Sequence, residues 1–240
     1  MLSRKTKLAL VAATAMFVSV AAQAVPVFTL SSVTGAWQYV VPQSGLTELS
    51  YPNVAGDEQV RWGATGQAIN NKSGYGFKGS APPPIPFILG DDFLLGTFTH
   101  FNLPITPNSS ILSAELLVTF SITVDAVVVG DIVLASFFHN ETVNQCAGLN
   151  CSDDHVTLTA ASGITNFEYD GFLYTLDITG FSTNSGVTTI DTFDTKEGLN
   201  NSAGLYANVT STPITVPEPG TLGLFGMALL AIGLMKRRQA

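Results

Sequence analysis

The sequence predicts an all-β protein in which residues 25–215 form a single antiparallel β-sandwich or jelly-roll domain. Many short windows are rich in β-branched and aromatic residues and are bounded by Gly, Asn, Asp or Pro. Few windows show the 3.6-residue apolar repeat of a helix. About 190 residues suffice for one good hydrophobic core, and the roughly nine or ten strands they hold close best as two packed sheets.

The predicted strands follow one another along this central part. In the clearest window, 113–124, polar residues such as Glu115, Thr119 and Thr123 alternate with apolar ones, which is the period of a half-buried strand. The other predicted strands cover 27–30, 36–41, 59–62, 97–102, 132–138, 156–158, 174–178, 188–193 and 205–209. Asp170-Gly171 lies between two aromatic runs and predicts a two-residue hairpin turn. The Pro-rich stretch 79–86 predicts an extended polyproline loop rather than a strand.

The N-terminus has the organisation of a secretory signal peptide. Ser3-Arg4-Lys5-Thr6-Lys7 is positively charged, residues 8–22 are apolar, and Ala22-Gln23-Ala24 supplies a small-x-small cleavage site. We therefore predict that residues 1–24 are removed, that the general secretion machinery and signal peptidase act on the chain, and that the mature chain begins at Val25. An uncleaved membrane anchor is the alternative.

The C-terminus predicts a transmembrane helix. Residues 220–235 are almost free of polar groups and run directly into Lys236-Arg237-Arg238. The apolar stretch is barely long enough to span about 30 Å of hydrocarbon, but a basic cluster beside it is held on the cytoplasmic side of a membrane. The two ends together place the domain between them outside the cytoplasm.

The domain between the two ends is strongly acidic. Seventeen of the eighteen Asp and Glu residues lie between Glu48 and Glu197, against four basic residues, Arg61, Lys72, Lys78 and Lys196, so thirteen negative charges remain. This excess argues against nucleic acid as a partner, because phosphate binding needs a basic surface. It permits cations or cationic partners, and its alternative role is to keep an exported domain soluble.

The chain has two cysteines, Cys146 and Cys151, which enclose four residues. In an exported chain we expect them to form a disulfide that pins a turn. Thiol redox sites favour the Cys-x-x-Cys spacing, which this pair does not have.

The last 25 residues resemble the PEP-CTERM sorting signal. The resemblance is carried by Val216-Pro217-Glu218-Pro219, by the apolar stretch from Thr221 to Met235 and by the basic tail, in that order. It implies recognition by an exosortase, a membrane-embedded cysteine protease-transpeptidase of Gram-negative bacteria that make extracellular polysaccharide. The protein would be anchored transiently in the inner membrane, cut near the motif, and then carried to the cell surface or released.

A second resemblance covers most of the mature chain. Thr99-His100-Phe101-Asn102, followed by Leu103-Pro104-Ile105, resembles the signature of the THxN family of PEP-CTERM proteins and of the related choice-of-anchor K domains. Asn140-Glu141-Thr142, ahead of the two cysteines, fits the same group. These families are defined by sequence and anchor, so the resemblance implies no reaction.

Three histidines, His100, His139 and His155, are the obvious candidate bases or metal ligands. None lies in a His-x-x-x-His, Gly-x-Ser-x-Gly or P-loop motif. His100 and Asn102 are two apart on a predicted strand, so their side chains share one face. They either contact a metal or substrate, or hydrogen-bond to the backbone where the chain turns into Leu103-Pro104.

Two acidic segments could hold calcium, and aromatic residues could bind sugar. The first segment is Asp153-Asp154-His155, and the second carries Asp191, Asp194 and Glu197. Neither has the spacing of a calcium loop, and solvated acidic loops are the alternative. Two tryptophans, Trp37 and Trp62, and six tyrosines could stack on sugars, but aromatics at alternating positions more often belong to the core.

From these features we predict a structural or adhesive surface protein associated with exopolysaccharide, without enzymatic activity and without a resident cofactor. The alternatives are a carbohydrate- or calcium-binding module and a hydrolase of matrix polymer that uses His100 as general base.

Overall fold

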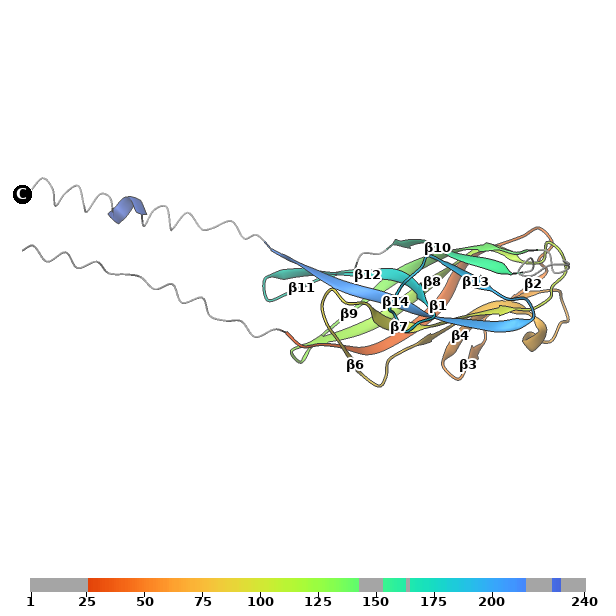
Figure 1. The fold of residues 1–240 in the computed structure, drawn as a ribbon, viewed down its shortest axis with the longest axis horizontal. Coiled ribbons are helices and arrows are strands. Elements are labelled where there is room, and N and C mark those ends of the chain that lie inside the picture. The colour runs from red at the N-terminus through yellow and green to blue at the C-terminus, as the bar shows by residue number, and fades with distance from the viewer. Residues whose placement is uncertain (1–25, 143–152, 163–164, 215–225, 230–240) are drawn as a thin grey trace, which may run out of the picture.

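Fourteen strands make up most of the chain that the structure, a computed structural model, describes (Figure 1). The described residues are 26–142, 153–162, 165–214 and 226–229. The strands form two antiparallel sheets, which confirms the predicted all-β class.

One sheet has six strands in the order β13-β10-β9-β8-β1-β6. Its members are β1 (Phe28–Pro42), β6 (Ile85–Phe87), β8 (Ile111–Val124), β9 (Val127–Asn140), β10 (Asp154–Ser162) and β13 (Thr192–Thr195). The long strands β1, β8 and β9 pair along most of their length and form the centre of this sheet.

The other sheet has the order β11-β12-β14-β7-β5-β4-β2, and the short β3 pairs with β4. Its members are β2 (Glu48–Ser50), β3 (Asn53–Val54), β4 (Asp57–Gly63), β5 (Ser73–Gly79), β7 (Phe93–Asn102), β11 (Thr165–Tyr169), β12 (Phe172–Ser182) and β14 (Leu199–Pro213). A 3-10 turn, η1 (Ile69–Asn71), precedes β5.

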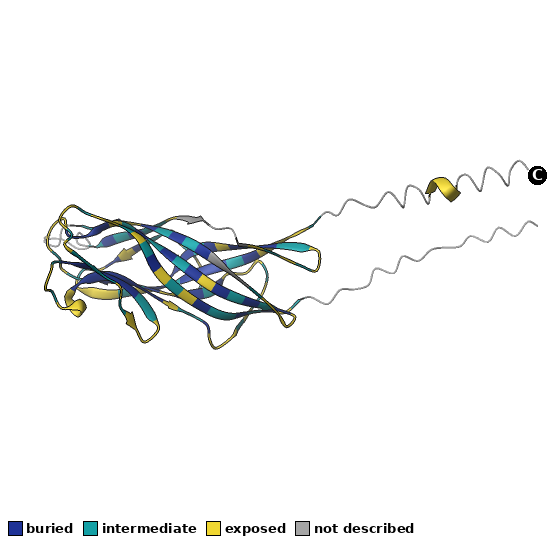
Figure 2. Ribbon diagram, turned by 180° about the vertical axis from the view of Figure 1, so that it is seen from behind, coloured by how far each residue is buried: buried dark blue, intermediate teal, exposed yellow. Residues whose placement is uncertain are grey.

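The two sheets enclose one core of buried side chains. Burial alternates along the strands, with inward residues buried and their neighbours exposed or half-buried (Figure 2). Phe98 of β7 and Phe137 of β9, which belong to different sheets, have ring centroids 5.2 Å apart. Each ring also contacts Phe181 of β12. Contacts of this kind hold the sheets face to face.

The strand directions give the sandwich two different ends. β1 begins and β14 ends at the same end, beside the tight turn of the β8–β9 hairpin (Figure 1). β7 ends and β10 begins at the opposite end, where β9 also ends. We call these the tail end and the far end. β1 has 15 residues, so at about 3.3 Å per residue the ends lie roughly 50 Å apart.

The hairpin prediction at Asp170-Gly171 is confirmed. β11 and β12 pair from Thr165 to Tyr169, and the two turn residues have positive φ values of 48° and 79°. Two consecutive positive φ values match the right-handed twist of the strands, and Gly171 adopts its value without steric cost.

Several boundaries differ from the predictions. The windows 27–30 and 36–41 are parts of one strand, β1, because Gly35 continues the pairing with β8 and lies against the ring of Phe77, where a Cβ would be only 2.5 Å away. The prediction of a loop over residues 79–86 was wrong in part, because Ile85–Phe87 forms the strand β6. This strand lies at a sheet edge and pairs on one side only, so Pro86 is tolerated there. The window 188–193 corresponds to β13, which begins at Thr192 rather than at residue 188.

Several predicted features lie outside the described residues. They are the signal peptide, Cys146 and Cys151 with their disulfide, the sorting motif 216–219, and most of the apolar C-terminal stretch. Residues 226–229 form one helical turn. Among the described residues, no helix is long and apolar enough to span a membrane. The disulfide and the transmembrane helix therefore stay predictions.

The core predicts opposite outcomes for two adjacent phenylalanines of β9. Phe137 is fully buried against aromatic rings of both sheets, whereas Phe138 is 48% exposed on the outer face. Phe137→Ala is expected to lower the free energy of unfolding by about 3–5 kcal/mol, because it leaves a cavity. Phe138→Ala is expected to change it by no more than about 1 kcal/mol. Denaturant titration of both variants measures the difference, and equal effects would contradict the assigned faces of β9.

Candidate functional site

At the far end of the sandwich, the apolar core gives way to polar side chains. The inward series of β7 runs Phe98, His100, Asn102, and that of β9 runs Phe137, His139. The rings of His100 and His139 face each other across the two sheets, with centroids 5.1 Å apart. Both side chains, and that of Asn102, are buried. The two histidines therefore meet inside the protein, although 38 positions separate them in sequence.

The hydrogen bonds of Thr195 on β13 define the tautomer of His100. The Thr195 hydroxyl lies 3.1 Å from the carbonyl oxygen of Asp154, to which it donates its only proton. It must therefore accept from Nδ1 of His100, 2.7 Å away, so Nδ1 carries the ring proton. The pKa of His100 is held well below its usual value by burial and, to a smaller extent, by His139 and Arg61. His100 is thus neutral, and its Nε2 presents a lone pair with no hydrogen-bond partner.

His139 lies between an aromatic wall and a carboxylate. Its Nδ1 is 2.6 Å from the hydroxyl of Tyr75, and its Nε2 is 3.1 Å from Oε2 of Glu141. Trp62 and Tyr75 pack against both histidine rings. Burial, together with Asp154 and Glu141, raises the pKa of Tyr75, which keeps its hydroxyl protonated. The aromatic rings fix both imidazoles in place.

Three carboxylates complete the cluster. Oδ1 of Asp154 accepts from the backbone N–H and the hydroxyl of Thr142, while Oδ2 is 4.0 Å from Nε2 of His139 and has no hydrogen bond. Burial and the nearby Glu141 raise the pKa of Asp154 to about 6. Burial, Asp154 and Glu141 raise the pKa of Glu197 to about 7. Three carboxyl groups are therefore crowded together here, and Nε2 of His139, 4.0 Å from Asp154, is the one basic atom near Asp154 among the ion pairs of the described residues.

These side chains form two overlapping groups of possible metal ligands. A ring nitrogen from each of His100 and His139 and an oxygen of Asp154 lie within 4.8 Å of one another. Oxygens of Glu141, Asp154 and Glu197 form a second group within the same limit. Unpartnered buried atoms in the cluster are His100 Nε2, Asn102 Oδ1, Asp154 Oδ2, Glu141 Oε1 and both carboxylate oxygens of Glu197. Buried polar atoms are normally paired, so this concentration makes the cluster the candidate binding site.

The residues singled out in the sequence fall in different places. Asn102 donates through Nδ2 to the carbonyl of Thr195, so it and His100 bond to β13 rather than to the adjoining turn at Leu103-Pro104. Thr99 faces outward and bonds to Ser202. His155 and Asp194 pair on the surface at 2.6 Å and do not join the cluster.

The two proposed acidic segments meet in the fold. Asp154 from the first segment and Glu197 from the second lie together, and the cluster also includes Glu141. Asp153 and Asp191 are not members of either group. The tryptophans proposed for sugar stacking belong to the core: Trp62 is fully buried, and Trp37 is buried and donates through Nε1 to the carbonyl of Glu58.

Sequence reasoning missed Tyr75 and Thr195, and it assigned His139 to no site. The alternation that places Phe137 and His139 on one face of β9 was present in the sequence. However, nothing in the sequence indicates that this face meets β7, because the contact depends on how the two sheets pack.

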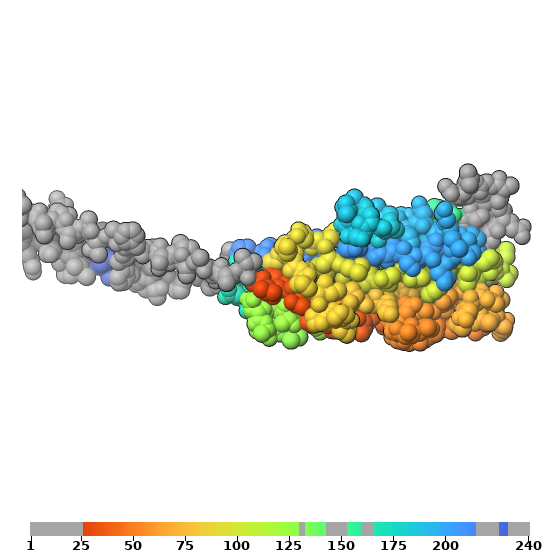
Figure 3. All heavy atoms as spheres, turned by 60° about the horizontal axis from the view of Figure 1, so that its bottom comes forward, coloured from red at the N-terminus to blue at the C-terminus, as the bar shows by residue number. Residues whose placement is uncertain are grey.

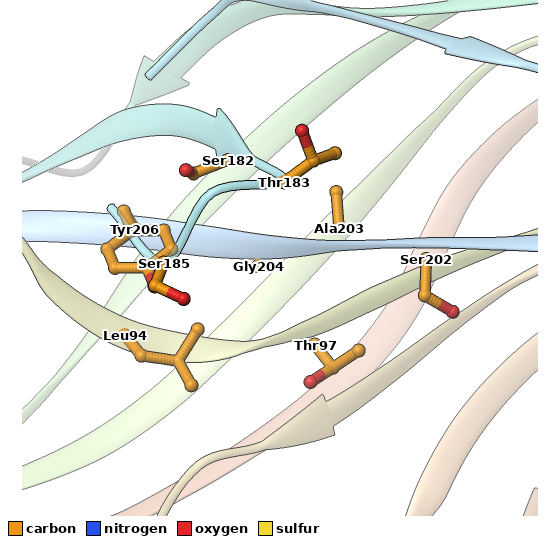
Figure 4. Close-up of a pocket in the computed structure, with 9 residues that line it drawn as sticks. All are labelled: Leu94, Thr97, Ser182, Thr183, Ser185, Ser202, Ala203, Gly204 and Tyr206. Carbon is orange, nitrogen blue, oxygen red and sulfur yellow. The ribbon is translucent and has the colours of Figure 1, made fainter. Parts of the chain in front are cut away.

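A separate hollow of about 300 Å³ lies on the eight-stranded sheet, beside the turn that follows β12 (Figure 4). Most of its lining residues carry hydroxyl groups. The lining consists of Leu94, Thr97, Ser182, Thr183, Ser185, Ser202, Ala203, Gly204 and Tyr206. The hollow therefore offers hydrogen-bonding groups around a partly apolar floor.

The comparisons with known proteins identify the C-terminal tail. Residues 215–238 match the PEP-CTERM protein-sorting motif. A search of curated proteins finds no match to the chain. The chain thus carries the sorting motif of exported surface proteins that are anchored before an exosortase processes them. The relationship to the THxN and choice-of-anchor K groups stays a prediction.

The role of Thr195 can be tested by removing its hydroxyl. Thr195→Val removes the hydroxyl that bonds to Nδ1 of His100 and to the carbonyl of Asp154 in a buried site, and is expected to lower the free energy of unfolding by about 1–3 kcal/mol. Thr99→Val, on the outer face, is the matched control, with an expected change within about 0.5 kcal/mol. Equal values in denaturant titrations would contradict the proposed hydrogen-bond chain.

Proposed function

We propose that the protein is a non-enzymatic structural or adhesive module of the cell surface or extracellular matrix, associated with exopolysaccharide. The observation that carries the proposal is the position of the sorting motif. The motif begins at residue 215, immediately after β14 ends at Pro213 at the tail end of the sandwich. The site-bearing end is the opposite one.

This geometry favours display of the far end. Residues 214–219 span at most about 20 Å even when extended, so the tail end of the sandwich stays close to the segment that an exosortase recognises. The space-filling view shows the start of β1 near the tail end and residues 50–70 near the other end (Figure 3). His139 lies 12 residues after the start of β9, so the polar cluster lies roughly 40 Å from the tail end along the strands.

The distribution of charge supports the role of a soluble, displayed module. Of the four basic residues between the ends, Lys72 and Arg61 are buried, which leaves Lys78 and Lys196 exposed on an acidic surface. Such a surface keeps a displayed module soluble and attracts cations. The complete burial of His100 opposes the alternative in which this residue acts as general base on a polymer.

Cell fractionation tests the sorting step. With an active exosortase, the protein is expected to be shortened and to leave the inner membrane. Without the exosortase, the unshortened form is expected to stay in the inner membrane. Immunoblots of both strains, and of a Glu218→Ala variant of the motif, give the measurement.

Glu168→Ala, an exposed residue of β11, is the control substitution and should leave processing unchanged. An unshortened inner-membrane form in both strains would overturn the processing step, and with it the proposed surface role.

The hollow favours a second candidate function, which is carbohydrate binding. The hydroxyl groups of Thr97, Thr183 and Ser185, which line the hollow together with the ring of Tyr206, are suited to hydrogen-bonding a sugar (Figure 4). A charged side chain in the hollow would block such contacts.

Carbohydrate binding by the hollow is tested by measuring how the protein binds exopolysaccharide from the producing cells. Ser202→Glu places a carboxylate in the hollow and is expected to weaken binding at least about tenfold, which corresponds to about 1.4 kcal/mol of binding free energy. Thr210→Glu, exposed on the same strand but outside the hollow, should bind like the wild type. Equal binding by both variants in a co-sedimentation assay would exclude the hollow as the site.

A further inference from the structure

We propose that His100, His139 and Asp154 bind one divalent ion of the first transition series, of the Zn²⁺ class, and that this ion cross-links the two sheets at the far end. Glu141 and Glu197 lie around the ion as further carboxylate ligands or as acceptors for its bound water. This goes beyond the proposed surface role and does not depend on it.

The available donor atoms favour such an ion. Nδ1 of His100 is occupied by Thr195, so the nitrogen left for a metal is the unpartnered Nε2. Oδ2 of Asp154 is fully buried and unpartnered, and it lies 4.0 Å from Nε2 of His139. A buried carboxylate oxygen without a hydrogen bond is costly unless a cation compensates it. Two imidazoles with a carboxylate suit Zn²⁺ and its neighbours, whereas Ca²⁺ takes six to eight oxygen ligands.

The hydrogen bonds around the ligands match those of metal sites. Thr195 holds Nδ1 of His100, and the Tyr75 hydroxyl lies where it can accept from Nδ1 of His139. Metal-bound histidines usually donate their other ring N–H to such a partner, which fixes the ring orientation. When the ion binds, Nε2 of His139 exchanges its bond with Glu141 for one to the metal. The single proton of the neutral ring then lies on Nδ1, from which the Tyr75 hydroxyl accepts.

The spacing of the ligands requires only a small contraction. Tetrahedral ligands about 2.0–2.1 Å from Zn²⁺ lie roughly 3.4 Å from one another. A ring nitrogen of each histidine and an oxygen of Asp154 lie within 4.8 Å of one another, so ligand atoms at these positions would approach by up to about 1.4 Å. Side-chain rotation can supply this movement.

The ion would join strands that belong to different sheets. His100 belongs to β7 of the eight-stranded sheet, whereas His139 and Asp154 belong to β9 and β10 of the six-stranded sheet. One metal would therefore hold the sheets together where the apolar core ends. Such a link stabilises the folded state because the unfolded chain does not form the site.

Metal binding is tested on the full chain in detergent after treatment with chelator. Addition of Zn²⁺ at about 100 times its dissociation constant is expected to raise the melting midpoint by roughly 5–10 °C. Co²⁺ should bind at one equivalent and give visible absorption bands from imidazole and carboxylate ligation. Mn²⁺ and Ca²⁺ are tested in parallel.

Two variants connect the effect to the proposed ligands. Asp154→Asn keeps an oxygen for the bonds from Thr142 and removes the charge, so its midpoint in chelator should stay within about 5 °C of the wild type while the Zn²⁺ shift is lost. If Asp154 had a purely structural role, the substitution would lower the midpoint in chelator and would not selectively abolish the Zn²⁺ shift. His100→Ala should also lose the Co²⁺ bands, but it removes a buried ring and is interpreted only where it folds.

His155→Ala is the matched control, because His155 is the exposed histidine outside the cluster, and it should keep the full Zn²⁺ shift. Absence of a shift and of Co²⁺ bands in the wild type would overturn the proposal and leave buried water as the partner of these atoms. A shift with Ca²⁺ but not Zn²⁺ would overturn the histidine ligand set. Retention of the Zn²⁺ shift in Asp154→Asn, or its loss in His155→Ala, would also overturn it. None of these outcomes bears on exosortase processing.

Discussion

The structure depends on the alternation of inward side chains on strands that face each other from two sheets. On β7 the inward positions pass from Phe98 to His100 and Asn102, and on β9 they pass from Phe137 to His139. The phenylalanine rings meet in the middle of the sandwich and the imidazole rings meet beyond them. Because a strand turns every second residue inward, the apolar contacts that hold the sheets together also bring the polar residues into contact.

The polar cluster is stable only if its buried atoms find partners. Hydrogen bonds join Nδ1 of His100 to Thr195, Nδ1 of His139 to Tyr75, and Oδ1 of Asp154 to Thr142. The other polar atoms of two of these side chains, Nε2 of His100 and Oδ2 of Asp154, have no hydrogen-bond partner. This one-sided pattern differs from a closed hydrogen-bond network, in which every buried group is paired. It gives the far end of the sandwich a chemical character that the uniformly apolar middle lacks.

The two ends of the sandwich also differ in their distance from the sorting motif. The chain enters β1 and leaves β14 at the tail end, and the PEP-CTERM motif follows directly. The cluster of His100, His139 and Asp154 lies at the other end, away from the sorting motif. The acidic surface, with Lys78 and Lys196 as its exposed basic residues in the described sandwich, is consistent with an environment outside the cell.

The sequence alone determined the all-β class, the positions of the long strands, the Asp170-Gly171 hairpin and the sorting motif, because each depends on local alternation, on turn conformation or on a contiguous motif. It did not indicate β5, the strand that carries Tyr75. It placed His100 and Asn102 on one face for the same reason. It could not show that β1 is continuous through Gly35, since that depends on the ring of Phe77 from the other sheet. Only the tertiary structure brought together His100, His139, Asp154 and Thr195, because the contacts among them come from sheet packing and strand pairing between residues far apart in the chain.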